Sequence, residues 1–181
     1  RIRQLSALAV YAVETPLQQI SRAIAKDHPE EINSDPDAAA AALARVRNAV
    51  PADIIEHLAD FDDTFALALL RHKAVDVFNI VPVQTGSLHR AQRLIQIAEA
   101  GGIPVLLGST VELGIGTAAA LHLGIASKGV TVSSDLVGPG LLADDVTAPR
   151  LTYQNGHLRA PRGIGLGVDL VPALVEKHRT P

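Results

Sequence analysis

Apolar and polar positions follow two different periods along the chain, which predict strands and helices in alternation. Residues 75–82 form a short apolar run rich in β-branched residues, which is typical of a strand buried on both faces. Residues 88–100 then place apolar side chains at helical spacing, and Gly101-Gly102 is a typical helix stop. Residues 103–107 form a second apolar run. Strand, helix and strand in this order predict a βαβ unit with parallel strands.

The rest of the chain adds elements of the same kinds. Asp35 is a good N-cap, and Pro36 a good first residue, for a helix over 38–50. Asn155-Gly156 predicts the type I′ turn of a small hairpin. Further helices are expected over 21–26, 64–73, 113–126 and 171–178, and further strands at the end of 1–13, around Ile54-Ile55 and over 130–134. Residues 163–168 are glycine-rich but follow no clear strand, so they do not predict a dinucleotide-binding loop.

Polar residues that follow the predicted strands are the first candidates for chemistry, because parallel α/β folds keep functional groups at the carboxyl ends of strands. Gln84 and Glu112 follow the two strands of the βαβ unit, and Glu14 stands at the tip of the first predicted strand. A carboxylate at such a tip can bind a metal ion or act as a base. A solvated loop residue would occupy the same position.

The stretch after the alanine-rich helix leaves two interpretations open. Glu56 and His57 fall at the end of a short predicted strand, and His57 alone is better explained as a structural residue. Asp60, Asp62 and Asp63 precede a predicted helix, where carboxylates commonly cap the helix and complement its dipole. One of them can instead bind a divalent ion, since hard cations prefer carboxylate oxygens.

Composition narrows the class of protein. The 181 residues suit one domain, and 48% are apolar, which is enough for a substantial core. The net charge is −3 without any basic run, which argues against nucleic acid as the main partner. No apolar run is long enough to cross a bilayer, and no signal peptide is evident. With no cysteine there are no disulfides or thiolates, so a cytoplasmic protein is expected.

Several short motifs, taken in order, resemble the C-terminal barrel domain of the enolase superfamily, in its mandelate racemase and muconate-lactonizing branch. The motifs are Val13-Glu14-Thr15-Pro16-Leu17, Val75-Asp76-Val77-Phe78-Asn79-Ile80, Thr85-Gly86-Ser87-Leu88, Ala98-Glu99-Ala100-Gly101-Gly102-Ile103, Gly108-Ser109-Thr110-Val111-Glu112, Ile115-Gly116, Asp135-Leu136-Val137-Gly138-Pro139 and Gly165-Leu166-Gly167-Val168. The resemblance covers residues 75–169 well and 1–17 fairly, and no motif in it is specific alone.

This resemblance implies an α/β fold, a (β/α) barrel of the TIM type. The chain is too short for a complete barrel with a capping domain, so we expect a partial barrel over 1–160. Residues 161–181 are expected to form a C-terminal tail that packs back on the barrel or on the missing capping domain. Homo-oligomers are usual in this family, and we expect one here.

The resemblance also implies a chemistry. Enzymes of this family bind Mg²⁺ with three carboxylates on successive strand ends, remove the proton α to a substrate carboxylate, and stabilise the enolate with the metal. Glu14 matches the second metal ligand, and Glu112 matches a carboxylate that faces the substrate as acid or electrophile.

The other functional positions match less directly. In this family the third metal ligand is the Asp of an Asp-Glu pair. Aligning Glu56-His57-Leu58 with that pair puts Ile55 at the ligand position, and shifting the alignment puts Asp60 there. Asp60 and Glu56 are therefore the candidates that carry a carboxylate. Val81 stands where many members carry a lysine, and Asn79 is expected to orient the substrate there.

Three functions follow as hypotheses. The first is a metal-dependent isomerase or lyase acting on a small carboxylate, with Mg²⁺ as cofactor. The second is a family member that has lost catalysis and serves as a scaffold or binding protein. Val81 and Ile55 motivate it, because each is apolar at a position that matches a functional residue of the family. The third is an unrelated parallel α/β domain that binds a ligand where the strand order reverses.

Overall fold

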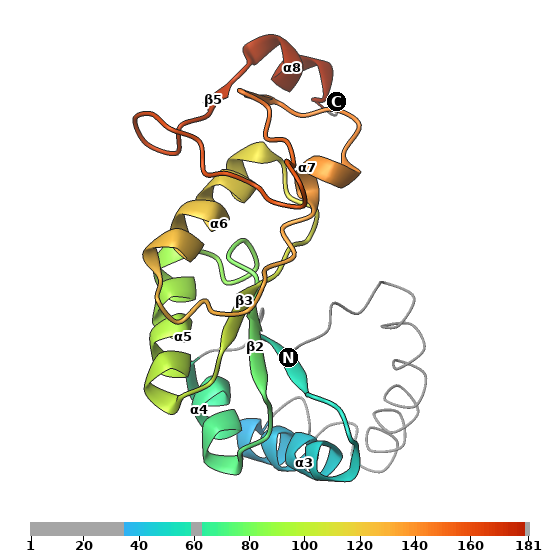
Figure 1. Ribbon diagram of the computed structural model, residues 1–181, viewed down its shortest axis with the longest axis vertical. Helices are drawn as coiled ribbons and strands as arrows, with labels where there is room; N and C mark the ends of the chain where they lie inside the picture. Colours follow the sequence, from blue (N-terminus) through green and yellow to red (C-terminus); the bar gives the residue numbers. More distant parts are fainter. Residues whose placement is uncertain (1–34, 59–62, 180–181) are drawn as a thin grey trace.

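The computed structural model describes residues 35–58 and 63–179 (Figure 1). The elements expected within 1–26 lie outside these residues, as do the candidate ligands Glu14 and Asp60. Among the helices that are described, the longest have 14 residues, and none is long and apolar enough to cross a bilayer.

Three parallel strands form the main sheet of the described chain, in the order β1-β2-β3. They are β1 (Ile55–Leu58), β2 (Val77–Ile80) and β3 (Val105–Leu107). The helices α3 (Pro36–Ala49), α4 (Asp63–His72), α5 (Leu88–Gly101) and α6 (Gly114–Ala126) alternate with them along the chain. The predicted βαβ unit is therefore confirmed, and the repeated alternation of parallel strands and helices is that of a partial (β/α) barrel.

The segment expected to form a strand over 130–134 runs beside β3 but forms only one parallel bridge, between Val105 and Val130. Beyond this bridge, the Leu107 amide donates to Ser134 Oγ at 3.0 Å, so a side chain replaces the backbone acceptor of a regular ladder. The Asp135 amide then donates to the Leu107 carbonyl at 3.1 Å. The segment therefore extends the sheet by a fourth, irregular position.

The two faces of the sheet differ in chemistry. Leu58, Phe78, Ile80, Val105 and Leu107 belong to the hydrophobic core, together with buried residues of the four helices. In Figure 1 helices α4, α5 and α6 lie along one side of β2 and β3. The alternate residues of the strands point to the opposite face, which would be the inside of a barrel.

Local sequence signals explain where two of the helices begin. Asp35 Oδ1 accepts a hydrogen bond of 2.9 Å from the Asp37 amide at the start of α3, so this predicted N-cap is confirmed. Ser87 Oγ accepts from the Arg90 amide at 3.1 Å at the start of α5. Helix α5 ends at Gly102, whose φ of +71° is the left-handed conformation that favours glycine.

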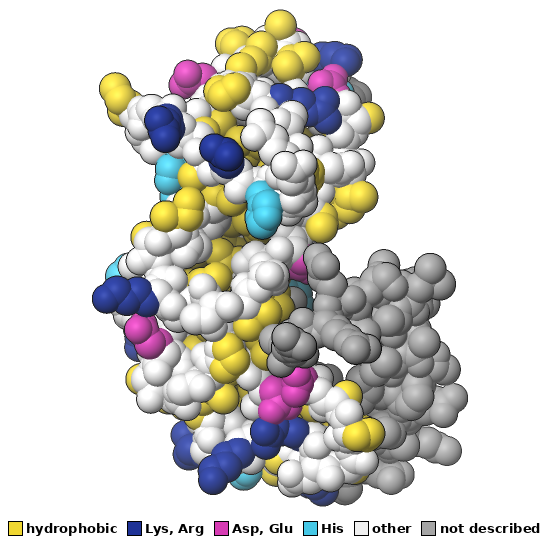
Figure 2. Space-filling model, in the orientation of Figure 1, with side chains coloured by type: hydrophobic (Ala, Val, Ile, Leu, Met, Phe, Trp, Pro, Cys, Tyr) yellow, Lys and Arg dark blue, Asp and Glu magenta, His cyan; other side chains and the backbone are white. Residues whose placement is uncertain are grey.

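The basic side chains near α3 and α4 have acidic partners. Lys and Arg gather at this end of the molecule in Figure 2, with acidic side chains among them. Arg47 Nη2 lies 2.6 Å from Asp76 Oδ1, and Arg71 Nη2 lies 2.9 Å from Asp37 Oδ2.

The remaining elements are short. They are α7 (Gly138–Leu141), β4 (Thr147–Ala148) paired antiparallel with β5 (Asp169–Leu170), and α8 (Pro172–Lys177). The turn expected at Asn155-Gly156 is present, with φ of +51° and +77° at the two residues. It closes a single bridge between Gln154 and His157 and not the longer hairpin expected from the sequence. His122 Nε2, on α6, lies 3.1 Å from the Leu166 carbonyl oxygen of the glycine-rich segment.

Candidate active site

The carboxyl ends of the parallel strands bring four polar side chains to one end of the sheet. His57 of β1 is in register with Asn79 of β2, and Asn79 is in register with Leu106 of β3. Residues that pair in this way share a face, so His57 and Asn79 point to the face opposite the core. Glu112 follows β3, and Asp135 ends the fourth segment.

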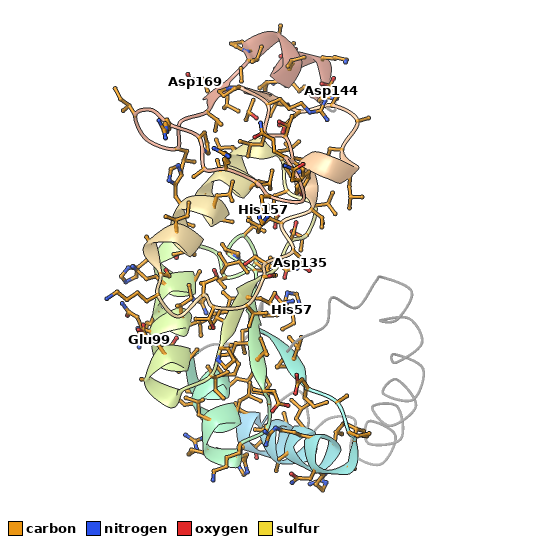
Figure 3. All side chains as sticks on the ribbon, viewed as in Figure 1. His57, Glu99, Asp135, Asp144, His157 and Asp169 are labelled. Atoms are coloured by element: carbon orange, nitrogen blue, oxygen red, sulfur yellow. The ribbon has the colours of Figure 1, made fainter. Side chains whose placement is uncertain are left out.

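Electrostatics link three of these side chains. Burial raises the pKa of the Asp135 carboxyl above its usual range, and the nearby Glu112 carboxylate raises it further, whereas His57 lowers it. Asp135 keeps part of its surface exposed to solvent. Figure 3 shows His57 and Asp135 close to each other near the ends of the central strands. The site therefore places two carboxyl groups and an imidazole within electrostatic reach.

A tight turn holds the carboxylate of Glu112. Ser109 Oγ donates to Glu112 Oε2 at 2.5 Å, and the Thr110 amide donates to Oε1 at 2.9 Å. The Val111 amide donates back to Ser109 Oγ at 3.1 Å. Val111 has a φ of +65°, which is rare and unfavourable for a β-branched residue. Strain of this kind is typical of functional sites.

Asn79 is held between its neighbours on the inner face. Its carboxamide oxygen is buried and has no hydrogen-bond partner among the described residues. A Cβ at Gly108 would overlap with this oxygen and would lie 2.9 Å from Val81 Cγ2. Glycine, which has no Cβ, is therefore required at 108 to leave room for the side chain of Asn79. Val81 is buried on the same face, two residues beyond Asn79.

Glu56 does not join this group. It is in register with Phe78, so its side chain starts from the face that carries the hydrophobic core. Burial raises the pKa of the Glu56 carboxyl to about 7. Of the expected residues, Asn79 lies on the inner face and Glu112 follows β3, while Glu56 is on the other face and Gln84 lies in an exposed turn.

Sequence reasoning missed His57 and Asp135 as site residues. A lone histidine at the end of a short strand is better explained as a structural residue, and no further signal marks His57 in the sequence. Asp135 follows a strand expected over 130–134, and the same rule that pointed to Glu112 applies to it.

The described residues do not contain a ready metal site. Within 35–58 and 63–179 there is no group of three or more His, Asp or Glu side chains that could hold a metal ion. Both oxygens of Glu112 already accept hydrogen bonds within the turn.

A partial (β/α) barrel with acid–base side chains at its strand ends is typical of enzyme domains. Comparison with known families identifies the family within this class. Residues 2–174 match the model of the family described as enolase C-terminal domain-like. The chain belongs to this family, and thus to the enolase superfamily in its mandelate racemase and muconate-lactonizing branch. The resemblance of the motifs and the expected fold class are confirmed.

Curated relatives agree with this assignment. The chain is 35% identical over 142 residues to muconate cycloisomerase 1-1 of Acinetobacter lwoffii, which covers 77% of this chain and 37% of the relative. It is 37% identical over 117 residues to a chloromuconate cycloisomerase of Pseudomonas putida, covering 65% of this chain and 31% of the relative. The chain thus spans about a third of the length of these relatives.

Solved structures show the same relation. A muconate lactonizing enzyme of Pseudomonas fluorescens, complexed with muconolactone, has a TM-score of 0.73 and 29% identity, over 80% of this chain and 39% of that one. The 2-chloromuconate cycloisomerase of Rhodococcus opacus 1CP has a TM-score of 0.72 and 32% identity, over 77% of this chain and 38% of that one.

Proposed function

We propose that this protein is an isomerase of the muconate cycloisomerase kind, which moves a proton at the carbon α to a carboxylate. The observation that carries the proposal is the position of Glu112. In a chain of this family, it lies in a strained turn at the strand ends, beside Asp135 and His57. The relatives named above are muconate and chloromuconate cycloisomerases, and we propose a small dicarboxylate of that type as substrate.

The chemistry requires both a proton carrier and a positive environment. A proton α to a carboxylate is too weakly acidic for an ordinary base unless the developing oxyanion is neutralised as it forms. Mg²⁺, when bound, would supply positive charge at the substrate carboxylate. We propose Glu14 and Asp60 as its ligands. For Glu56, the other ligand candidate, the position on the core side of β1 supports a buried, structural carboxyl more than a ligand.

The described residues suggest how the proton moves. Val81 provides no amine where many members have a lysine, so we propose that the proton is exchanged by the imidazole of His57 or the carboxyl of Asp135 at the strand ends. The raised pKa of Asp135 suits this role. Glu112, which follows β3, would act as acid or electrophile. The oxygen of Asn79 is packed against Gly108, which leaves its amide nitrogen to donate to a substrate carboxylate.

A turnover measurement tests this proposal. The full-length protein should convert a muconate into its lactone, followed by the loss of diene absorbance. Glu112→Gln should lower kcat by roughly 10²- to 10⁴-fold, the usual contribution of a general acid or base. Glu99→Gln, on the exposed side of α5 and distant from the strand ends in Figure 3, is the matched control and should leave kcat unchanged. Equal rates in the two variants would exclude the role of Glu112.

Metal binding is tested separately. Titration of Mg²⁺ by calorimetry should show a loss of affinity in Glu14→Gln and in Asp60→Asn, because each removes an anionic ligand oxygen. Glu56→Gln should bind Mg²⁺ as the unchanged protein does. Unaltered affinity in both Glu14→Gln and Asp60→Asn would rule out the proposed ligand set.

One observation favours a second function, that of a scaffold or binding protein without catalysis. Val81 is buried at the inner end of β2 and cannot accept a proton. Exchange of solvent deuterium into a panel of small carboxylates distinguishes the two proposals. Detectable exchange at the α carbon would exclude the scaffold. We further propose that the protein forms homo-oligomers in the cytoplasm, with no nucleic acid or membrane partner, which size measurement and cell fractionation would test.

A further inference from the structure

The helix that follows Glu112 begins without a cap of its own. Helix α6 starts at Gly114, its N-cap position is the apolar Leu113, and its first turn contains no acidic residue. The first amides of a helix have no partner within the helix and need an acceptor from elsewhere. In α3 and α5 a neighbouring Asp or Ser supplies it.

Asp145 supplies this acceptor from 31 residues further along the chain. Its Oδ2 accepts a hydrogen bond of 2.9 Å from the Gly114 amide, and its Oδ1 accepts one of 2.7 Å from the Val146 amide. The side chain is buried, with 3% of the residue exposed. A buried amide that loses its acceptor is costly, so this contact fixes the start of α6 two residues after Glu112.

Two glycines allow the segment around Asp145 to press against the Glu112 turn. A Cβ at Gly114 would lie 2.6 Å from Asp145 Oδ2, and a Cβ at Gly138 would overlap with the Glu112 carbonyl oxygen. Thr117 Oγ1 approaches the same carbonyl from α6 at 3.4 Å. The backbone carbonyl of Glu112 is therefore closely packed between α6 and Gly138.

The turn before Glu112 needs such support. Val111 holds an unfavourable φ of +65°, and a strained residue keeps its conformation only where the surrounding structure imposes it. Ser109 and Thr110 hold the carboxylate, but both belong to the turn itself. Asp145 comes from a different part of the chain and binds the Gly114 amide, two residues after Glu112.

We propose that Asp145 is a positioning residue for Glu112, which it holds in place through the start of α6. The proposal rests on the function proposed above, in which Glu112 acts on the substrate. It assigns no contact between Asp145 and the substrate.

Turnover measured in the full-length protein, well below the unfolding temperature of every variant, tests the proposal. Asp145→Ala should lower kcat by roughly 10- to 100-fold, the usual effect of a small displacement of a reacting group, with a smaller change in KM. Asp145→Asn keeps one acceptor oxygen and should have an intermediate effect, so it carries the test if Asp145→Ala does not fold. Asp35→Ala removes the cap of α3, far from Glu112, and should leave kcat unchanged.

A double-mutant cycle separates positioning from general stability. If Asp145 acts through Glu112, Asp145→Ala should change the residual rate of Glu112→Gln by less than about twofold, because the two losses are not independent. Loss of kcat by the same factor in both backgrounds would overturn the proposal. A lower melting temperature with unchanged kcat would overturn it as well.

A spectroscopic readout makes the test independent of turnover. Measured by NMR, the amides of 111–114 should exchange faster with solvent in Asp145→Ala and Asp145→Asn but not in Asp35→Ala. If the unchanged protein turns over no carboxylate, the proposed function fails and this measurement still decides the positioning role. Unaltered exchange at these amides would exclude it.

Discussion

Two regions of this molecule are held together in different ways. The sheet region, residues 35–58 and 63–126, contains the three parallel strands and the four longer helices around one hydrophobic core. The C-terminal region, residues 130–179, has short elements only. It is held by contacts between residues far apart in sequence, such as the hydrogen bond of Tyr153 Oη to the Leu136 carbonyl and the ion pair of Lys177 with Asp144 at 2.7 Å.

Both regions expose large apolar side chains, but they differ in how many they bury. Leu141, Ile164 and Leu170 of the C-terminal region are exposed, and Figure 2 shows apolar side chains over this part of the molecule. In the sheet region the largest apolar side chains are buried against the helices. Apolar burial therefore stabilises the first region, whereas specific polar contacts order the second.

The candidate site lies where the two regions meet. His57, Asn79 and Glu112 belong to the sheet region, while Asp135 and the buried Asp145 belong to the C-terminal region. The proposed reacting groups thus come from both regions, and the hydrogen bond of Asp145 joins the C-terminal region to the start of α6. The comparison teaches that stability and positioning are assigned to different parts of the chain, which mutations can test.

The largest effect is expected in the core of the sheet region. Phe78 is fully buried on β2, so Phe78→Ala should lower the free energy of unfolding by about 3–5 kcal/mol through lost burial and a cavity. Chemical denaturation measures this change. Ile125→Ala, at a position 73% exposed on α6, is the control and should change it by less than about 0.5 kcal/mol. Similar losses in both variants would contradict the assigned core.

A second effect of the sheet region depends on pH. The pKa of Glu56 is raised from 4.5 to about 7 by burial, so the folded state binds this proton more tightly than the unfolded state. Stability should therefore fall as the pH rises from 4.5 to 7, by at most about 3 kcal/mol, and change no further above that range. Glu56→Gln should remove this slope. Denaturation between pH 4 and 8 measures it, and an unchanged slope in the variant would disprove the assignment.

A smaller and more local effect is expected in the C-terminal region. Gly138→Ala would push against the backbone of Glu112, and we expect a loss of about 1–3 kcal/mol together with altered amide exchange at 111–114. Gly124→Ala is the control, since only the Leu107 side chain lies near, and alanine favours a helix interior. If Gly124→Ala disturbs amides 111–114 as much as Gly138→Ala does, the contact between Gly138 and Glu112 is not what fixes the turn.

Local signals determined much of the fold from the sequence alone. Three such signals depend on neighbours within a few residues: the apolar run over 75–82, the helical spacing over 88–100 and the stop at Gly101-Gly102. Each predicted element lies where it was expected. The N-cap at Asp35 is local in the same way. The rule that functional groups follow parallel strands was enough to find Glu112.

Only the tertiary structure decided which side chains meet. A slip of one residue moves every side chain of a strand to the other face, and β1 is too short and too mixed in polarity to fix its own parity. The register with β2 places His57 beside Asn79 and puts Glu56 on the core side. Asp145 reaches Gly114 across 31 residues, a contact that no local pattern records. Burial and long-range pairing depend on the whole fold, so the sequence by itself named Glu112 as a candidate and the structure supplied its neighbours.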